Sequence, residues 1–379
     1  MKYHMPTAII FGPGAISELG GVARDKLHSD RPLLVTDKGI IRAGIAEKVL
    51  PRVPTTATFD EVEQNPRHTT VDRGGEIARK LKPDLIIGLG GGSVLDAAKA
   101  IALLATNPGR IEDYEGREKY KAAPLPVLAV PTTCGTGSEV TWVSVITHTG
   151  RQFKMSIKGP LMYPAAALVD PDLLITLPSH LVASTGLDAL THAVEAFTVK
   201  PASVITDTLA LESLRLIFRS LPEAYRDIEN NAKAREGLML GSLLAGMAFG
   251  NSDVGAVHCL AESVGSLYDT PHGVANAVFL PFVMEFNLEA AEAKYARIAS
   301  VAGIEAESQR EAARRLIARI KEISRGLSIP SFRALKIPEK DFALIAQKSF
   351  HNNSNLSNPR DATTEDYLDI LRRAHQAEL

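Results

Sequence analysis

The first half of the chain alternates short apolar segments with stretches of helical periodicity. The segments Arg31–Asp37, Asp84–Leu89 and Leu125–Pro131 are largely apolar at successive positions, as strands buried on both faces of a parallel sheet are. Between them, Val71–Lys82 and Ser93–Ala105 carry apolar residues three and four positions apart, which predicts helices. The alternation therefore predicts an α/β fold with a mainly parallel sheet.

The pattern changes near Pro178, after which helical periodicity continues and no alternating strand is recognisable. We therefore predict an α/β domain over residues 1–178 and an all-α domain over residues 179–379. The polar, turn-rich segment Phe350–Pro359 is expected to be a surface loop before a last helix. The other helices are predicted at Leu181–Val199, Ile205–Leu221, Ala232–Phe249 and Ala290–Val301.

Composition and charge exclude several classes of protein. The 379 residues include 42 Lys and Arg against 44 Asp and Glu, so the formal charge of −2 gives no reason to expect a nucleic acid partner. The apolar runs are shorter than the roughly 18 residues of a membrane span, and no apolar export signal follows the N-terminus. Two cysteines, Cys134 and Cys259, cannot form a disulfide framework. We expect a cytoplasmic protein.

A glycine-rich loop lies where a predicted strand meets a predicted helix. The run Gly88–Ser93 lets backbone amides approach a phosphate closely, and the helix N-terminus favours negative charge. We therefore expect a pyrophosphate here, although Ser93 departs from the last position of the usual G-x-G-x-x-G fingerprint. The alternative is a tight turn without a ligand. Asp96 is either a cofactor contact or an acid that complements the helix dipole.

Two further segments are candidates for the same cofactor site. Asp37 ends a predicted strand, where a carboxylate can accept hydrogen bonds from the ribose of NAD and repel the 2′-phosphate of NADP, or simply form a turn. The hydroxyl-rich loop Pro131–Glu139 follows another strand and is expected to lie beside the glycine loop. Within it, Cys134 is expected to be a buried structural thiol. Lys154 by itself is expected to face solvent.

A second group of residues has the chemistry of metal ligands. Asp188 and His192 lie four positions apart in a helical pattern, so their side chains share one helix face. With His258 and His272 they make three imidazoles and one carboxylate, a set that suits Fe(II), Zn(II), Ni(II) or Mn(II). A simple hydrogen bond on the helix surface is the alternative for the first pair. His258, however, lies in an apolar run where a buried imidazole needs a partner.

Longer motifs point to a known family. The chain resembles the iron-containing alcohol dehydrogenase family, and the resemblance covers essentially its whole length. The residues that carry it are Phe11–Gly14, Gly90–Ser93 with Asp96 and Lys99, Pro131–Glu139, Ala167–Asp170, Ala183–Glu195, and Ala245–Asn287 with its run Thr270–Asn276.

The resemblance implies a dinucleotide-binding α/β domain, a helical domain with a metal, and an active-site cleft between them. It implies NAD as the cofactor, Fe(II) as the first choice of metal, and a homodimer or larger homo-oligomer. By position, the implied metal ligands are Asp188, His192, His258 and His272. The implied cofactor residues are Asp37, Gly90, Gly91, Gly92, Ser93, Asp96, Thr132, Thr133, Thr136 and Lys154.

One position departs from the family pattern. Many members carry another histidine four residues after the third ligand, where this chain has Glu262. If His258 lies on a helix, Glu262 shares its face. It could then relay a proton, orient a ligand, join the coordination sphere, or turn to solvent.

The predicted function is hydride transfer between a small alcohol, or its aldehyde or ketone, and NAD. One rival is a sugar-phosphate cyclase similar to dehydroquinate synthase, and another is polyol oxidation of the glycerol dehydrogenase type. A phosphate substrate would favour Arg or Lys near the metal, but residues 241–293 contain neither. A non-enzymatic NAD-binding protein would have little use for the four metal-type ligands. The sequence does not identify the alcohol.

Overall fold

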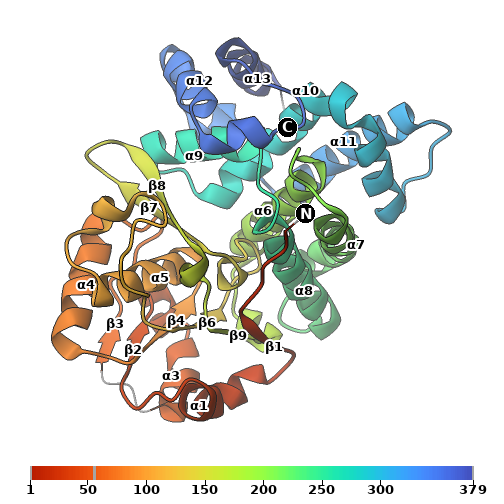
Figure 1. Ribbon diagram of the computed structural model, residues 1–379. Coiled ribbons are helices and arrows are strands. Elements are labelled where there is room, and N and C mark those ends of the chain that lie inside the picture. Colours follow the sequence, from red (N-terminus) through yellow and green to blue (C-terminus); the bar gives the residue numbers. More distant parts are fainter. Residues whose placement is uncertain (1, 54–56, 378–379) are drawn as a thin grey trace. The chain divides into compact units, whose positions relative to one another are not determined.

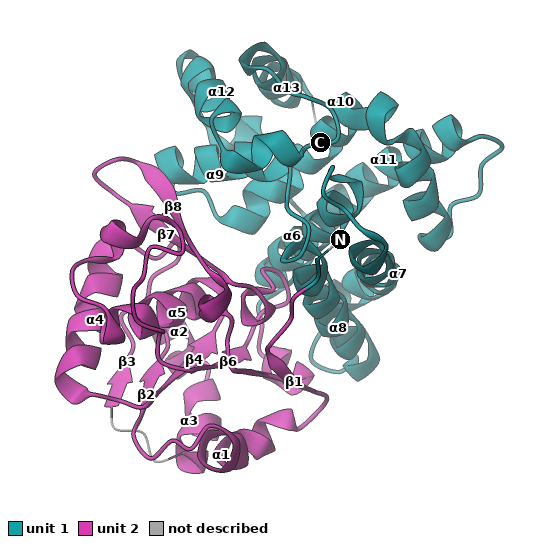
Figure 2. Cartoon of the chain, in the orientation of Figure 1, with its two compact units in different colours: residues 1–3, 178–379 teal, residues 4–177 magenta. Residues whose placement is uncertain are grey.

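The computed structural model describes residues 2–53 and 57–377 (Figure 1). The chain separates into two compact units, His4–Leu177 and Pro178–Leu379, the latter together with Met1–Tyr3 (Figure 2). The first unit is α/β, and the described residues of the second form helices without a strand. The predicted fold class is therefore confirmed.

The α/β unit is built on a six-stranded parallel sheet in the order β1-β9-β6-β4-β2-β3. The strands β2, β4, β6 and β9 are buried along their whole length, as continuous apolar segments in a parallel sheet should be. Three of them were predicted from the sequence. The strands are β1 (Ala8–Phe11), β2 (Pro32–Val35), β3 (Ala57–Phe59), β4 (Leu85–Gly90), β6 (Val127–Pro131) and β9 (Ala166–Val169).

Helices cover the sheet because successive strand residues point to opposite faces. Leu33 and Val35 of β2 pack with apolar residues of α4 and α5, whereas Leu34 packs in a separate cluster with residues of α1 and α3. A smaller sheet in the order β5-β8-β7 lies within the same unit. The remaining elements are α1 (Leu19–Gly21), α2 (Lys38–Arg42), α3 (Ile45–Val49), α4 (His68–Leu81), α5 (Gly92–Thr106), β5 (Gly116–Arg117), β7 (Val143–His148) and β8 (Phe153–Lys158).

The second unit is a helical assembly in which α6 packs against α7, α8 and α10. The four helices predicted there are present, with one of them much longer than predicted. Short 3-10 turns connect some of the helices. The main helices are α6 (Ser179–Thr198), α7 (Val204–Arg226), α8 (Ala232–Phe249), α9 (Ala256–Tyr268), α10 (His272–Val301), α11 (Gln309–Gly326), α12 (Phe342–Phe350) and α13 (Thr364–Gln376).

Helix α10 begins eighteen residues before the predicted helix Ala290–Val301 and contains Pro281. The first half of α10 is buried almost all round, so it lacks the polar face on which the sequence prediction depended. By length and composition alone α10 could cross a membrane, but 72% of its apolar window is buried inside the protein. It is therefore a core helix of this unit.

The polar segment Phe350–Pro359 corrects a prediction. It contains a 3-10 turn, Asn353–Ser357, and Asn358 is only 1% exposed. The Asn358 amide exchanges two hydrogen bonds with the amide of Asn287 on α10, at 2.8 and 3.0 Å. The prediction of a surface loop before a last helix is therefore only partly right: Leu356 is 80% exposed and α13 follows, but the buried Asn358 satisfies buried polar groups.

Candidate active site

Four side chains in the helical unit converge on one point. Asp188 and His192 come from α6, His258 from α9 and His272 from α10. One potential ligand atom from each lies within 4.8 Å of those of the others. Three of the four residues are at most 4% exposed, while the His272 side chain keeps 27% of its surface accessible. The structure thus brings together the whole predicted ligand set on one side of α6.

Gly273 lets helix α10, which carries His272, approach helix α6 closely. A Cβ added at Gly273 would lie 2.3 Å from the backbone oxygen of Ser184 on α6, which no real side chain tolerates. The absence of a side chain allows the N-terminal turn of α10 to touch α6. Nε2 of the neighbouring His272 then lies 3.7 Å from Oδ1 of Asp188. The His-Gly pair in the sequence therefore has a packing reason.

The side-chain amide of Asn276 lies among the four groups. Its Nδ2 atom is 2.6 Å from Oδ1 of Asp188 and 3.1 Å from Nε2 of both His258 and His272. An amide has only two hydrogens for these three acceptors. Nε2 of His192 is in turn 3.0 Å from Nε2 of His258. The nitrogen lone pairs and the carboxylate thus face a common centre.

The electrostatics of the centre follow from its burial. Burial alone would raise the pKa of Asp188, but the three imidazoles and the Asn276 amide hold that pKa below its ordinary value. Burial would likewise lower the pKa of His258, yet the Glu195 carboxylate beside it raises that pKa above its ordinary value. The centre therefore favours a charged Asp188 carboxylate, and the imidazoles around it can either be protonated or bind a metal ion.

The donor set fits a divalent first-row metal. One carboxylate oxygen and three imidazole nitrogens are suitable ligands, and a buried carboxylate needs a positive partner. Oδ1 of Asn276 is buried and has no hydrogen-bond partner among the described residues, so the protein does not satisfy every polar atom at this centre. A metal bound here would be held by Asp188, His192, His258 and His272.

Sequence reasoning included Glu195 and Asn276 in the family motifs but assigned no role at this centre to either. Glu195 is 4% exposed and its Oε2 lies 2.5 Å from Nδ1 of His258. It follows His192 by three positions on α6, and Asn276 follows His272 by four positions on α10. Helical spacing from a predicted ligand is the signal that would have found both.

Glu262 lies on α9 four residues after His258, so the helical position that we assumed for it is confirmed. It is half-buried and outside the group of four potential ligands. Its Oε2 accepts a hydrogen bond of 2.6 Å from the amide of Asn352. The carboxylate is therefore held by the protein rather than turned freely to solvent.

A second group of potential ligands, His68, Glu112 and His148, occurs in the α/β unit. Both ring nitrogens of His148 are engaged, Nδ1 by the backbone N–H of Arg151 at 3.2 Å and Nε2 by Oε2 of Glu112 at 2.8 Å. The rings of His68 and His148 are stacked 4.3 Å apart at 11°, so their in-plane lone pairs do not converge. This group is a stacked, hydrogen-bonded cluster, and we assign no metal to it.

The predicted cofactor segments lie at the ends of three adjacent strands. Strand β4 pairs with β2 on one side and β6 on the other, and all three are parallel (Figure 1). Asp37, the glycine loop after β4 and the loop Pro131–Glu139 therefore follow neighbouring strands at the same edge of the sheet. The expectation that the second loop lies beside the glycine loop is confirmed, because the backbone N–H of Thr132 donates to the oxygen of Gly90 at 3.1 Å.

The two loops pack tightly against each other. A Cβ added at Gly92 would lie 2.4 Å from Cγ2 of Thr136, and one at Gly91 would lie 3.1 Å from Cγ2 of Thr133. The glycines thus keep the loop Pro131–Glu139, which we call the threonine loop, next to the N-terminus of α5, which begins at Gly92. The combination of hydroxyls with a helix N-terminus that has no side-chain cap suits a pyrophosphate. Oγ1 of Thr132 is buried and without a hydrogen-bond partner in the described chain.

The charged cofactor candidates are anchored in different ways. Asp37 is half-buried and caps α2, its Oδ1 accepting from the N–H of Ile40 at 2.9 Å. Lys154 is 8% exposed and its Nζ donates to Oδ1 of Asn65 at 2.9 Å, so the expectation that it faces solvent was wrong. Cys134 is fully buried, as expected.

Asp96 organises the protein around α5. Its Oδ1 accepts from the hydroxyl of Ser138 at 2.6 Å and lies 3.2 Å from Nζ of Lys99. Its Oδ2 accepts from the backbone N–H of Val145 at 3.0 Å. The carboxylate thus links the start of α5 to the threonine loop and to β7. A direct cofactor contact by Asp96 stays a prediction.

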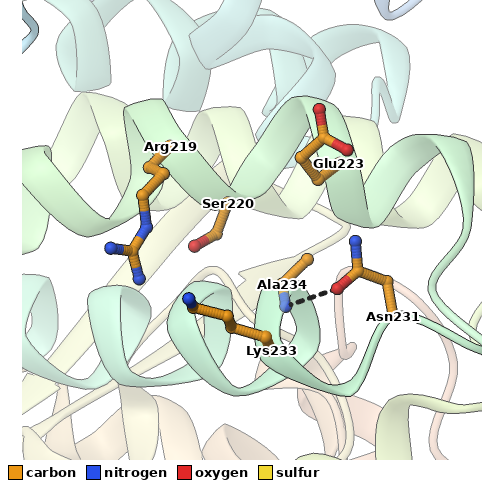
Figure 3. Close-up of a pocket in the computed structure, with 6 residues that line it drawn as sticks. All are labelled: Arg219, Ser220, Glu223, Asn231, Lys233 and Ala234. Atoms are coloured by element: carbon orange, nitrogen blue, oxygen red, sulfur yellow. Dashed lines mark hydrogen bonds between the residues drawn. The ribbon is translucent and has the colours of Figure 1, made fainter.

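A pocket of about 190 Å³ lies between α7 and the start of α8 (Figure 3). None of its lining residues belongs to the ligand set. Asn231 caps α8 here by accepting from the N–H of Ala234 at 3.0 Å, and Arg219 and Lys233 are exposed. We assign no chemistry to it. The lining residues are Arg219, Ser220, Glu223, Asn231, Lys233 and Ala234.

Comparison with known proteins gives one consistent result. Residues 6–171 match the family model described as iron-containing alcohol dehydrogenase. Residues 182–375 match the model of the C-terminal part of the Fe-containing alcohol dehydrogenase family.

Individual relatives agree with the family models. The chain is 41% identical to 1,3-propanediol dehydrogenase of Citrobacter freundii over 381 residues, covering 98% of each chain. A crystal structure of 1,3-propanediol oxidoreductase has a TM-score of 0.95 at 40% identity and covers 98% of this chain and 99% of its own. Sulfoacetaldehyde reductase from Bifidobacterium kashiwanohense, solved with NAD⁺, has a TM-score of 0.90 at 28% identity, covering 100% and 99%.

Proposed function

Because the chain belongs to the iron-containing alcohol dehydrogenase family and so interconverts alcohols and carbonyl compounds, we propose that it does so with NAD and a divalent metal. We propose Fe(II) as the metal, with Zn(II), Ni(II) and Mn(II) as the alternatives that the ligand set accepts. The observation that carries the proposal is the convergence of Asp188, His192, His258 and His272 within 4.8 Å. The family assignment also disfavours the sugar-phosphate cyclase considered from the sequence.

When bound, the metal supplies a Lewis acid for the substrate oxygen and NAD supplies the hydride acceptor. Two residues of the chain shape the site in which this metal would bind. Asp188 contributes the negative charge that offsets a cation in a buried site. Phe249 stacks on the imidazole of His192 with ring centroids 4.2 Å apart, which shields one face of this ligand from water.

We assign the transfer of the alcohol proton to Glu262. Its position one helical turn after His258 supports this role, and Asn352 holds its carboxylate in place. A carboxylate so placed can accept a proton and return it in the reverse reaction.

For the cofactor, we propose that the loops at the ends of β4 and β6 bind the pyrophosphate of NAD and that Asp37 binds its ribose. The support is the adjacency of these strand ends and the start of α5 at Gly92. A solved relative that contains NAD⁺ agrees with this choice. The homo-oligomeric state and the cytoplasmic location expected from the sequence stay predictions.

For the substrate, we propose a small alcohol or aldehyde without a phosphate group. Residues 241–293, which contain two of the four ligands, include no Lys or Arg that could pair with a phosphate. The relatives named above act on a diol and on a sulfonated aldehyde, so the polar end of the substrate varies within the family.

Metal analysis combined with activity tests the proposal. Purified protein should contain a divalent metal and reduce NAD with a small primary or secondary alcohol. His258→Ala and His272→Ala should lose metal and activity together, by about 10³-fold in activity, since a Lewis acid supplies several kcal/mol to the transition state. His351→Ala, an exposed histidine of the same unit, is the control and should retain both. Full metal content in both ligand variants would refute the centre.

A further inference from the structure

The two ring nitrogens of His258 have different partners. Nε2 faces the ligand group, whereas Nδ1 lies 2.5 Å from Oε2 of Glu195. The other carboxylate oxygen of Glu195 accepts from the backbone N–H of Val257 at 2.8 Å. A charged carboxylate has no hydrogen to donate, so the hydrogen of a neutral His258 ring must reside on Nδ1. The lone pair is then left on Nε2, the nitrogen that faces the ligand group.

The start of α9, which carries His258, is fixed by two acceptors. Oε1 of Glu195 accepts a hydrogen bond from the N–H of Val257, and Oδ1 of Asn358 accepts one from the N–H of Ala256 at 3.2 Å. A Cβ added at Gly255 would lie 3.0 Å from Oδ1 of Asn358 and 3.1 Å from Oε1 of Glu195, so the backbone fits closely between them. Only Glu195, however, also contacts the imidazole. The two residues therefore allow helix anchoring to be separated from control of the ring.

We propose that Glu195 is a positioning residue that fixes the Nδ1–H tautomer of His258 and thereby prepares Nε2 to bind the metal. This inference rests on the metal centre proposed above. Ligand histidines commonly donate their second N–H to a carboxylate, which orients the ring and strengthens the ligand. Here the same carboxylate is also tied to the backbone, so it cannot rotate away without leaving a buried N–H unpaired.

Glutamine at this position should reverse the tautomer. Its carbonyl oxygen must face the N–H of Val257, because a donor there requires an acceptor. The amide nitrogen then faces Nδ1 of His258 and donates to it, which places the ring hydrogen on Nε2. A protonated Nε2 cannot coordinate a metal. The opposite amide orientation would set two buried donors against each other at Val257, which is also unfavourable.

The test compares the wild-type protein with Glu195→Gln and Asn358→Ala. Zn(II) is titrated into metal-free protein against a competing chelator, and ¹⁵N spectra of histidine-labelled, metal-free protein report the tautomer at a pH where the ring is neutral. His258→Ala identifies the signals of this ring. We expect Nδ1–H in the wild type, Nε2–H in Glu195→Gln, and Zn(II) affinity about 10- to 100-fold lower in that variant. Asn358→Ala should keep the Nδ1–H tautomer.

The possible outcomes separate the two proposals. An Nε2–H tautomer in the wild-type protein overturns the inference without any variant, even if Glu195→Gln fails to fold. Wild-type Zn(II) affinity in folded Glu195→Gln also overturns it. If the wild-type protein shows Nδ1–H but binds no divalent metal, the metal centre fails while the role of Glu195 in setting the tautomer stands. Loss of the Nδ1–H tautomer in Asn358→Ala would assign the control to helix anchoring instead.

Discussion

The two predicted sites are built in opposite ways. In the helical unit, side chains on α6, α9 and α10 face one another, and their partners are mostly other side chains. In the α/β unit, side chains such as Lys99 hold backbone loops in place, and the loops themselves are the predicted binding surface. The helical site is thus a matter of side-chain identity, whereas the loop site is a matter of backbone position. Substitutions should therefore change ligand chemistry in one unit and loop geometry in the other.

The largest effect is expected where the loop site depends on one cation. Lys99 is 1% exposed, and its Nζ donates to the backbone oxygens of Ser138 at 3.1 Å and Val143, besides pairing with Asp96. Lys99→Met removes the buried donor from these carbonyl oxygens and leaves the Asp96 carboxylate without its cation, although Ser138 and Val145 still donate to it. We expect a loss of about 3–5 kcal/mol in the free energy of unfolding.

Urea unfolding, and titration with NADH followed by the fluorescence of its dihydronicotinamide ring, measure this effect. NAD binding should weaken together with stability, because the threonine loop loses its anchor. Lys80→Met, at an exposed lysine on α4, is the control and should change neither quantity. If Lys99→Met destabilises the protein yet binds NAD with unchanged affinity, the loop does not depend on this anchor, and the contrast between the two sites is weakened.

The pH dependence of stability tests a second buried side chain of the loop site, Glu139. Burial raises the pKa of the Glu139 carboxyl to about 7, from 4.5. Between these values the folded state binds more protons than the unfolded state, so the free energy of unfolding falls as pH rises through this window. The total decrease is about 3 kcal/mol. Glu139→Gln lacks this titration, so its stability relative to the wild type should increase from pH 4.5 to above pH 7.

Urea unfolding of both proteins at several pH values from 4.5 to 8 provides the measurement. Other titrating groups cancel in the difference between the two proteins. A difference that stays constant with pH would show that Glu139 is charged throughout, and that its pairing with Lys99 outweighs its burial.

The contrast between side-chain identity and backbone position also explains which features could be predicted from the sequence. Strands β2, β4 and β6 were predictable because buried parallel strands are continuously apolar. The ligand set was predictable because Asp188 and His192 lie at helical spacing and the ligating residue types are few. Sequence alone therefore locates both the sheet and the candidate metal centre.

The features that escaped prediction depend on backbone groups or on complete burial. The acceptors of Lys99 are carbonyl oxygens, which every residue has, so no pattern marks them. Asn358 was assigned to a surface loop because polarity usually indicates exposure, whereas its amide pairs with buried groups of α9 and α10. The first half of α10 has no polar face to reveal its period.

On the helical side, Glu262 tests whether side-chain chemistry extends beyond the ligands. Glu262→Gln preserves shape and can keep the hydrogen bond from Asn352, but it cannot accept the alcohol proton. We expect unchanged metal content and kcat lower by about 10²-fold, the usual scale of acid–base assistance. Glu236→Gln, at an exposed position of α8, is the control. Near wild-type kcat from pH 6 to 10 would remove Glu262 from proton transfer.

The smallest effect is expected at Asp37, where charge and capping can be separated. Its Oδ1 caps α2, so Asp37→Gly would remove both the cap and the charge. Asp37→Asn keeps a capping oxygen while removing the charge that opposes the 2′-phosphate of NADP. The ratio of kcat/KM for NAD over NADP should fall by about tenfold, since one close like-charge contact at an effective dielectric near 20 is worth about 1.4 kcal/mol or more. Urea unfolding should show Asp37→Asn close to the wild type and Asp37→Gly slightly less stable. If the ratio is unchanged in Asp37→Asn, the carboxylate serves only the start of α2, and cofactor choice lies with the backbone of the loops.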